Sequence, residues 1–185
     1  MSGISCSTML NSAETMTVNG TWSGASAART IVSSGPPGAI TQGVGALRAS
    51  ITSPAPPGGS NSTWAVLSGF APVSMTTWQA LQVDMYFSPG VMGAGFREFR
   101  LYGNGGCLIS STVLGPMDGA NTLTFWLDFP NACANSSTAL TSLSFVMHSD
   151  SFGVGDVYID NMRLLSNNCP FTPTITITPG GPSLT

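Results

Sequence analysis

The stretch ALQVDMYF, residues 80–87, alternates between two kinds of side chain. Every second residue from Leu81 to Phe87 is apolar, whereas Gln82, Asp84 and Tyr86 between them carry polar atoms. Successive side chains of a β-strand point to opposite faces of a sheet. The stretch therefore predicts a strand with one face in a hydrophobic core and the other outside it.

Similar short stretches recur along the chain and are separated by turn-forming residues. Clusters such as SPAPPGGSN, residues 53–61, contain the Gly, Pro, Asn and Ser that set turns. Strands at this spacing, without any long helical pattern, predict an all-β fold: a two-sheet antiparallel β-sandwich of the jelly-roll type. The predicted strands are 46–51, 63–67, 80–87, 96–102, 107–113, 123–129, 143–148 and 157–165.

The faces of these strands that point away from the core combine aromatic rings with hydrogen-bonding groups. Aromatic rings can cover the apolar C–H faces of a sugar, while amide, carboxylate and guanidinium groups bind its hydroxyls. We predict that Tyr86, Tyr102 and Trp126 lie together on one open surface of one sheet. The residues of this predicted ligand site are Gln82, Asp84, Tyr86, Glu98, Arg100, Tyr102, Trp126 and Asp128, with His148 at its margin.

Three further tryptophans lie near predicted strand ends. Trp78 precedes the strand at 80–87 and is added to the predicted ligand site. Trp64 suits either an exposed rim or a cap on the core, and Trp22 is predicted to be in the core. The alternative for the whole set is a solvated sheet face without a ligand, because one face of a sandwich sheet is normally polar.

The composition limits the classes of partner. Only 7% of the 185 residues are charged, lysine is absent, and the formal net charge is −3. A chain without a basic patch is a poor partner for nucleic acid. We find no run of about 18 apolar residues, so no membrane-spanning segment is predicted, and no signal peptide is recognisable at the start of this sequence. A neutral surface rich in Ser, Thr and Asn suits neutral ligands.

The four cysteines, Cys6, Cys107, Cys133 and Cys169, include no C-x-x-C pair, which argues against zinc. Three disulfide pairings are possible, and we favour Cys6–Cys169 with Cys107–Cys133. Two disulfides predict an oxidising compartment and hence a secreted, extracellular protein. The alternative is four free buried thiols.

The last segment, PFTPTITITPGGPSLT (residues 170–185), has the composition of an extended Thr/Pro-rich linker. We predict one domain at residues 4–169 and a linker at 170–185. Linkers of this kind join modules in secreted multidomain proteins.

Four motifs, taken in order, resemble those of the β-jelly-roll carbohydrate-binding modules of bacterial glycoside hydrolases. They are MLNSAETMTVNGTW (9–22), GVGALRASI (43–51), ALQVDMYF (80–87) and VYIDNMRLL (157–165). A finer resemblance is to modules of soil or compost glucanases. The resemblance implies a non-catalytic module that targets a covalently linked glycoside hydrolase to plant cell-wall β-glucans, such as cellooligosaccharides, mixed-linkage glucan or xyloglucan.

The same resemblance suggests why Asp160 interrupts the last predicted strand. Many such modules hold a structural Ca²⁺ where the first and last strands meet. It implies Glu14 and Asp160 as carboxylate ligands, with backbone carbonyls near residues 43–47, and oxygen ligands of this kind suit Ca²⁺. The alternative is that Asp160 pairs with Arg163 or faces solvent.

Two other functions compete with glycan binding. A small glycosidase or polysaccharide lyase would need two carboxylates across the bond that it cleaves, and Asp84, Glu98 and Asp128 could supply such a pair. The sequence has a single histidine and no G-x-S-x-G elbow, which argues against triad or zinc chemistry. A structural or adhesive sandwich domain would bury Trp64, Trp78 and Trp126 in its core.

Overall fold

The computed structural model describes residues 6–16, 20–23, 27–52, 60–74, 77–92, 97–104, 106–113, 118–127, 139–149 and 153–166. These residues form eleven β-strands and no helix. The strands are β1 (Cys6–Asn11), β2 (Thr21–Ser23), β3 (Ala28–Val32), β4 (Ala46–Ile51), β5 (Ser60–Ser74), β6 (Ala80–Phe87), β7 (Arg97–Gly103), β8 (Cys107–Val113), β9 (Gly119–Trp126), β10 (Ala139–Ser149) and β11 (Gly155–Ser166).

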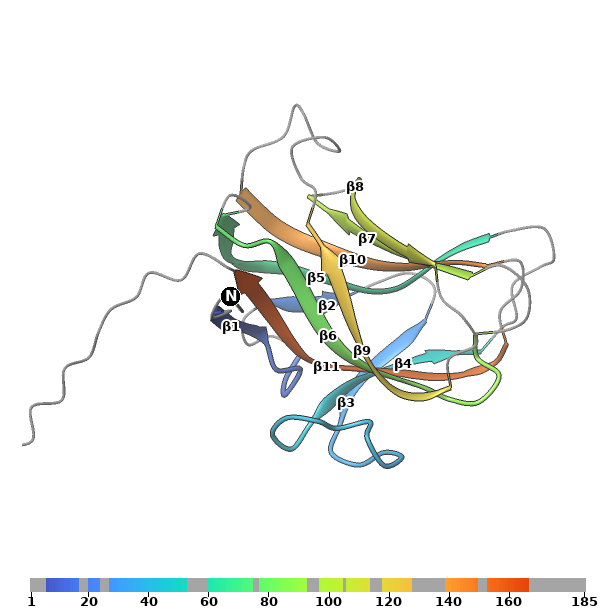
Figure 1. The fold of residues 1–185 in the computed structure, drawn as a ribbon. Coiled ribbons are helices and arrows are strands. Elements are labelled where there is room, and N and C mark those ends of the chain that lie inside the picture. Colours follow the sequence, from blue (N-terminus) through green and yellow to red (C-terminus); the bar gives the residue numbers. More distant parts are fainter. Residues whose placement is uncertain are drawn as a thin grey trace, which may run out of the picture.

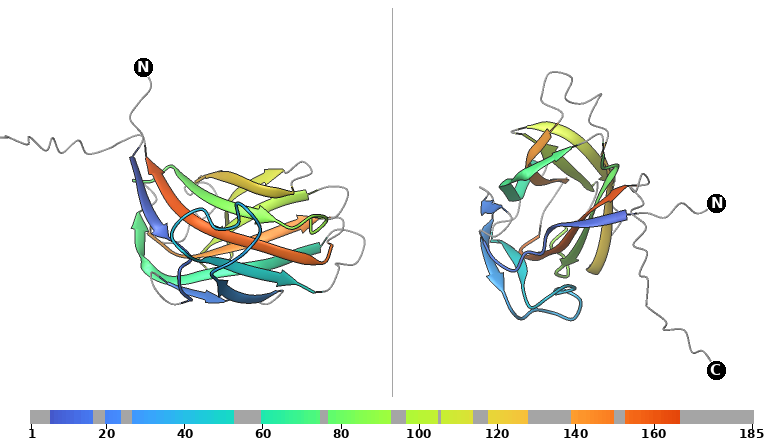
Figure 2. Two further views of the ribbon diagram at one scale, coloured as in Figure 1. Left: turned by 90° about the horizontal axis from the view of Figure 1, so that it is seen from below. Right: turned by 90° about the vertical axis from the view of Figure 1, so that its left-hand side faces the viewer.

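The strands form two antiparallel sheets that face each other (Figure 1). Sheet A has the order β3-β4-β11-β6-β9, with β1 paired to β11 beside this path, and sheet B has the order β2-β5-β10-β7-β8. The predicted all-β antiparallel sandwich is therefore confirmed. Figure 2 shows the two layers from two further directions.

Each of the eight predicted strands coincides with or overlaps an observed one, and the differences fall at the ends and edges. β9 ends at Trp126, whereas the prediction placed this strand at 123–129. β1, β2 and β3 were not predicted. β3 has the sequence ARTIV and none of its residues is buried, so it lacks the alternation that identifies a half-buried strand.

The hydrophobic core lies between the sheets and is rich in aromatic rings. Trp64 of β5 is fully buried, and its ring centroid lies 5.6 Å from that of Phe99 in sheet B and 6.2 Å from that of Phe87 in sheet A. Phe99 in turn lies 5.5 Å from Phe125 of sheet A. These contacts join the two layers and fix which face of each strand points outward.

The chain passes between the layers several times. β6 belongs to sheet A, and the next strand along the chain, β7, belongs to sheet B. β8 and β9 are divided in the same way, although they too are consecutive. Neighbours in sequence therefore do not share an outer surface here, and this decides where the predicted site residues lie.

Cys107 is disulfide-bonded. Cys133 and Cys169 lie outside the described residues, and of Cys6 only the backbone in β1 is described. The two favoured pairings therefore stay predictions. Asp128 and the proposed linker at 170–185 also lie outside the described residues. No helix long and apolar enough to cross a membrane occurs in the described part of the chain.

Candidate functional site

The structure divides the predicted ligand site between the two outer faces of the sandwich. Sheet A carries Gln82, Asp84 and Tyr86 on β6 and Trp126 on β9. Sheet B carries the other three strand residues, all on β7: Glu98, Arg100 and Tyr102.

The prediction that Tyr86, Tyr102 and Trp126 share one surface is therefore wrong. Alternation along a strand separates core-facing from outward-facing side chains, but a sandwich has two outward faces. The rings on sheet A are also apart from each other. In the register of β6 with β9, Trp126 is opposite Ala80 and Tyr86 is opposite Ala120, six residues further along β6. Six residues of strand span roughly 20 Å.

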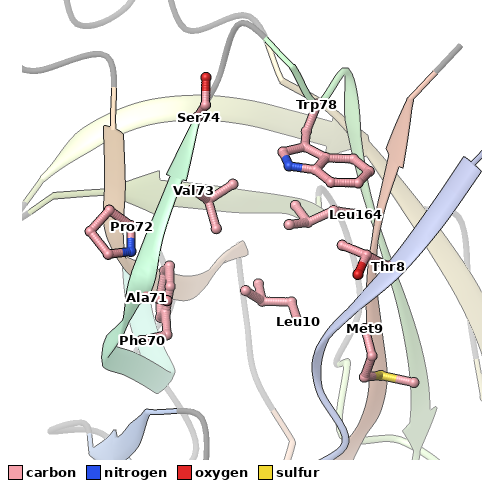
Figure 3. A pocket seen from close by; sticks show the side chains of 10 residues that line it. All are labelled: Thr8, Met9, Leu10, Phe70, Ala71, Pro72, Val73, Ser74, Trp78 and Leu164. Atoms are coloured by element: carbon pink, nitrogen blue, oxygen red, sulfur yellow. The ribbon is translucent and has the colours of Figure 1, made fainter. Parts of the chain in front are cut away.

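Trp78 lies apart from both outer faces, in an opening at the edge of the sandwich (Figure 3). The cavity has a volume of about 460 Å³ and runs between β1 and the end of β5. Its lining is mostly apolar: Thr8, Met9, Leu10, Phe70, Ala71, Pro72, Val73, Ser74, Trp78 and Leu164. Trp78 is half-buried and packs against the core. Trp22 lies in the core, as predicted. Trp64 is fully buried and does not form an exposed rim, whereas Trp126 is 67% exposed.

The segment between β3 and β4, residues 33–45, crosses the outer face of sheet A and covers part of it (Figure 2). A methyl group added at Gly35 would lie 3.2 Å from the ring of Tyr158, and one added at Gly38 would lie 2.8 Å from Ala120. Tyr158 packs edge-on against Tyr86, with the ring centroids 5.8 Å apart. The covering segment lies over β11 and part of β6 on this half of sheet A, while Ala120 and Thr122 of β9 stay exposed.

Asp160 holds the covering segment on the sheet, and this explains an acid in the middle of a buried strand. Its side chain is 1% exposed. Oδ2 accepts hydrogen bonds from the backbone N–H of Thr41 at 2.7 Å and of Gln42 at 2.9 Å, and Oδ1 accepts one from the N–H of Asn161 at 2.7 Å. Burial raises the pKa of Asp160, while these N–H donors act in the opposite direction.

Asp84 belongs to the same polar cluster, because it pairs with Asp160 in the register of β6 and β11. It accepts hydrogen bonds from Thr122 Oγ1 at 2.7 Å and Asn161 Nδ2 at 2.6 Å. The Thr41 hydroxyl lies 2.9 Å from Asp84 Oδ2 and 3.1 Å from Asp160 Oδ2. The hydroxyl has one hydrogen, so it can satisfy only one of the two carboxylates at a time.

Asn161 occupies a β-bulge next to Asp160, and its φ is 48°. A bulge with a residue in the left-handed region turns consecutive side chains of one strand toward the same side. Its Nδ2 reaches Asp84, whereas its buried Oδ1 has no hydrogen-bond partner in the described part of the chain. The cluster of Asp84, Asp160 and Asn161 is thus a structural anchor for residues 33–45.

Glu14 and Asp160, the predicted calcium ligands, both accept hydrogen bonds from backbone N–H groups. Both Glu14 oxygens accept from the backbone N–H of Val44, at 3.0 and 3.2 Å. No group of three or more acidic, His or Cys side chains in the described residues could hold a metal. A Ca²⁺ ion bound by these two carboxylates would share them with the N–H donors of Thr41, Gln42 and Val44.

Calcium binding stays a prediction that melting with and without EDTA tests. A lower melting midpoint in EDTA would support a bound ion. An unchanged midpoint would indicate that Glu14 and Asp160 interact with the N–H groups of Thr41, Gln42 and Val44 and hold no stabilising ion.

The outer face of sheet B carries the predicted residues that do lie together. Arg100 Nη2 lies 2.6 Å from Glu98 Oε2, and Arg100 Nε donates to the same oxygen at 2.8 Å. Glu98 and Arg100 are two residues apart on β7, so both point to the same side as Tyr102. In the register of β7 with β10, these three residues are opposite His148, Val146 and Ser144.

The charges on this face stabilise each other. Burial raises the pKa of Glu98, but hydrogen bonds from Arg100 and Ser111 and the charge of Arg100 outweigh it, so the pKa is lowered overall. The hydrogen bond to Glu98 likewise raises the pKa of Arg100, and a hydrogen bond to Tyr102 adds to this effect. The guanidinium is therefore charged and held in place, with part of its surface open to solvent.

Solved carbohydrate-binding modules share the fold. A CBM27 module of Caldicellulosiruptor saccharolyticus in complex with mannohexaose matches with a TM-score of 0.59 at 13% identity, over 88% of this chain and 98% of that chain. The family 11 module of Clostridium thermocellum in complex with a β-1,3-1,4-mixed-linked tetrasaccharide matches with a TM-score of 0.52 at 17% identity, over 85% and 94%.

The fold also occurs as part of larger enzymes. An exo-β-agarase matches with a TM-score of 0.55 at 13% identity, over 87% of this chain but 25% of that chain. No family model matches the sequence, and no curated protein matches it in sequence. At these identities the likeness establishes the fold.

Sequence reasoning missed the residues that hold the covering segment on sheet A. Thr41, Thr122 and Asn161 are small polar residues, and nothing in their local sequence distinguishes them from turn or surface positions. The one available signal was the pair of acids, Asp84 and Asp160, each placed within an otherwise apolar strand. Two such acids indicate a buried polar partner, because an unpaired buried carboxylate is strongly disfavoured.

Proposed function

We propose that this chain is a non-catalytic module that binds a neutral polysaccharide on the outer face of sheet B. The observation that supports this most directly is the row of Glu98, Arg100 and Tyr102 on β7. It combines a positioned guanidinium, a carboxylate and an aromatic ring on one sheet face. No described segment crosses this face as residues 33–45 cross sheet A.

The row has the chemistry that a sugar chain requires. From Glu98 to Tyr102 it extends over four residues of strand, roughly 13 Å, which exceeds the size of a single pyranose ring. Arg100 can donate and Glu98 can accept hydrogen bonds from hydroxyl groups, and the Tyr102 ring can lie against C–H groups. The ion pair fixes the polar groups before binding, so little side-chain entropy is lost when a ligand is bound.

A β-glucan is the proposed polysaccharide. The motif resemblance supports this class, and the structurally similar modules were solved with mannohexaose and with a mixed-linked tetrasaccharide. The weakly charged surface, with 7% charged residues, suits such uncharged chains.

Affinity electrophoresis tests the function. Gels containing mixed-linkage glucan, xyloglucan, hydroxyethylcellulose or mannan are expected to retard the protein in at least one case. Arg100→Ala and Tyr102→Ala should each reduce the retardation, whereas Arg48→Ala, on sheet A, should not. Equal mobility of the unaltered protein in every gel would contradict the proposal.

The arrangement of acids does not favour the competing hydrolase. Asp84 and Glu98, two of the three acids considered for catalysis, lie on different sheets and cannot flank one glycosidic bond. Asp84 does lie beside Asp160, but hydrogen bonds to Thr41, Thr122 and Asn161 engage both acids beneath residues 33–45. Release of reducing sugar by the purified domain would overturn the non-catalytic assignment.

We further propose that the module acts in a secreted protein and brings an attached glycoside hydrolase to its polymer. A tethered binding module raises the effective concentration of an enzyme on the substrate without new contacts in the active site. Fusing the chain through residues 170–185 to a glucanase should speed hydrolysis of the polymer and leave hydrolysis of a short soluble oligosaccharide unchanged.

A further inference from the structure

Residues 33–45 are anchored over only one half of the outer face of sheet A. The other half carries an exposed tryptophan. Trp126 is 67% exposed, although an indole is among the side chains with most to gain from burial. It lies at the end of β9, opposite Ala80 of β6, which is opposite Leu165 of β11. Ala80 itself is fully buried, so the exposed surface at this end of the sheet comes from the Trp126 ring.

The next row of residues on this half of the sheet supplies hydrogen-bonding groups. Thr124 of β9 is opposite Gln82 of β6, and Gln82 is opposite Arg163 of β11. Neighbouring strands are about 4.8 Å apart, so these three side chains follow one another across the face. Trp126 and Thr124 are two residues apart on β9 and point to the same side.

The hydrogen-bonding capacity of this row is largely unused. Gln82 Nε2 lies 3.5 Å from Thr124 Oγ1, at the limit of a hydrogen bond. Arg163 Nη2 lies 3.6 Å from Asp84 Oδ1, and the buried Arg163 Nε has no partner in the described part of the chain. The Arg163 side chain is 32% exposed. Asp84 offsets its charge, so the row suits a neutral ligand.

We propose that Trp126, Gln82, Thr124 and Arg163, here called the Trp126 surface, form a second contact site for a neutral pyranose chain. The indole covers the C–H face of one sugar ring, and the amide, hydroxyl and guanidinium groups bind the hydroxyls of that ring or its neighbour. The proposal rests on the proposed function in its ligand class, but it concerns the opposite face of the molecule.

The two sites cannot be filled by one short oligosaccharide. The two sheets are separated by a packed core, and sheets in such sandwiches lie about 10 Å apart before their outer side chains are added. The module would therefore be bivalent and could hold two polymer chains, or two stretches of one long chain.

A titration followed by NMR tests the Trp126 surface. Cellohexaose and mannohexaose are added separately to ¹⁵N-labelled protein, and the Trp126 indole N–H and the Gln82 side-chain amide report on sheet A. The Tyr102 backbone amide and the Arg100 Nε–H report on sheet B. We expect both groups of signals to move with one of the sugars, each with its own dissociation constant.

Three variants separate the two faces. Trp126→Ala should weaken binding at Gln82 about tenfold or more and leave the Tyr102 titration unchanged, while Trp126→Phe should restore part of the affinity. Arg100→Ala should weaken binding at Tyr102 and leave the Gln82 titration unchanged. Val154→Ala alters another exposed apolar residue, away from both rows, and should change neither titration.

Each outcome bears on one proposal or the other. If Tyr102 and Arg100 respond to either sugar while the Trp126 and Gln82 signals stay still, the second site is refuted and the proposed function stands. If only the Trp126 surface responds, the proposed location of the function on sheet B is refuted. Stationary signals on both faces would overturn both.

Discussion

At the scale of single residues, Glu98 determines how Arg100 can act. The carboxylate fixes the guanidinium on the open face of sheet B through two contacts from Nε and Nη2. Without it, Arg100 would be a long side chain with many rotamers, and ordering it on binding would reduce the affinity.

The lowered pKa of Glu98 gives a pH dependence with a definite sign. An acid whose pKa falls on folding stabilises the native state above its unfolded value, here 4.5, and loses this contribution as the pH falls through the folded pKa. Because the ionised Glu98 also holds Arg100 in position for the ligand, polysaccharide retardation should be constant from pH 7 to about pH 5. It should decrease below pH 4.5, where Glu98 begins to take up a proton. Glu98→Gln should weaken retardation and remove this acid-side decrease, whereas Asp118→Asn should preserve it.

Asp160 offers a prediction about stability. Replacing it by asparagine places an amide opposite the N–H groups of Thr41 and Gln42, which need acceptors. Asp160→Asn should lower the free energy of unfolding by about 2–3 kcal/mol in urea denaturation at pH 7. Asp156→Asn is the matched control, because the half-buried Asp156 accepts a hydrogen bond from the Ser50 hydroxyl and lies on the same strand. An equal loss in both variants would contradict the anchoring role.

At the scale of elements, the segment at residues 33–45 depends on close approach at one glycine. Gly43 has a φ of +69°, and a Cβ built there would fall on the Glu14 carboxylate. Gly69 has a nearly identical φ of +73° but open space around it. Alanine substitutions at Gly43 and Gly69 therefore separate the effect of backbone strain from that of steric contact.

Gly69→Ala should cost about 1 kcal/mol through backbone strain alone. Gly43→Ala should cost at least about 1 kcal/mol more, because Glu14 must move and leave the N–H of Val44. Thermal and urea denaturation of the two variants measure this difference. Equal losses would show that Glu14 gives way without consequence for the fold.

The strands also show which parts of the fold could be predicted from the sequence. Alternation identified β6 to the residue, because its core-facing side chains are all large and apolar. It could not identify β3, whose side chains are all at least partly exposed. Nor could it assign β6 and β7 to different sheets, because this depends on how loops cross the core and not on the period of either strand.

The same limit explains the candidate site. The described residues that were predicted to face outward on β6, β7 and β9 do point away from the core, but the prediction placed residues of two different sheets on one surface. The covering role of residues 33–45 depends on hydrogen bonds between positions more than 100 residues apart, such as Thr41 with Asp160. No local pattern contains that information.

At the scale of the whole molecule, the aromatic core holds the two sheets together. Trp64 contacts rings from both layers, so its truncation would open a large cavity between them. Trp64→Ala should lower the free energy of unfolding by about 3–5 kcal/mol, while Trp126→Ala, at an exposed position, should change it by less than about 0.5 kcal/mol. Urea denaturation of both variants measures this, and similar losses would contradict the assigned burial.

The pairing of β1 with β11 places Cys6 opposite Ser166, so the first and last described strands begin and end side by side. A domain built in this way can be spliced into a surface loop of another protein without forcing the loop apart. A circularly permuted form, with the old ends joined and new ones opened elsewhere, should fold as well. We therefore expect that the sandwich can be joined to another protein at one end, at both ends, or within a host chain.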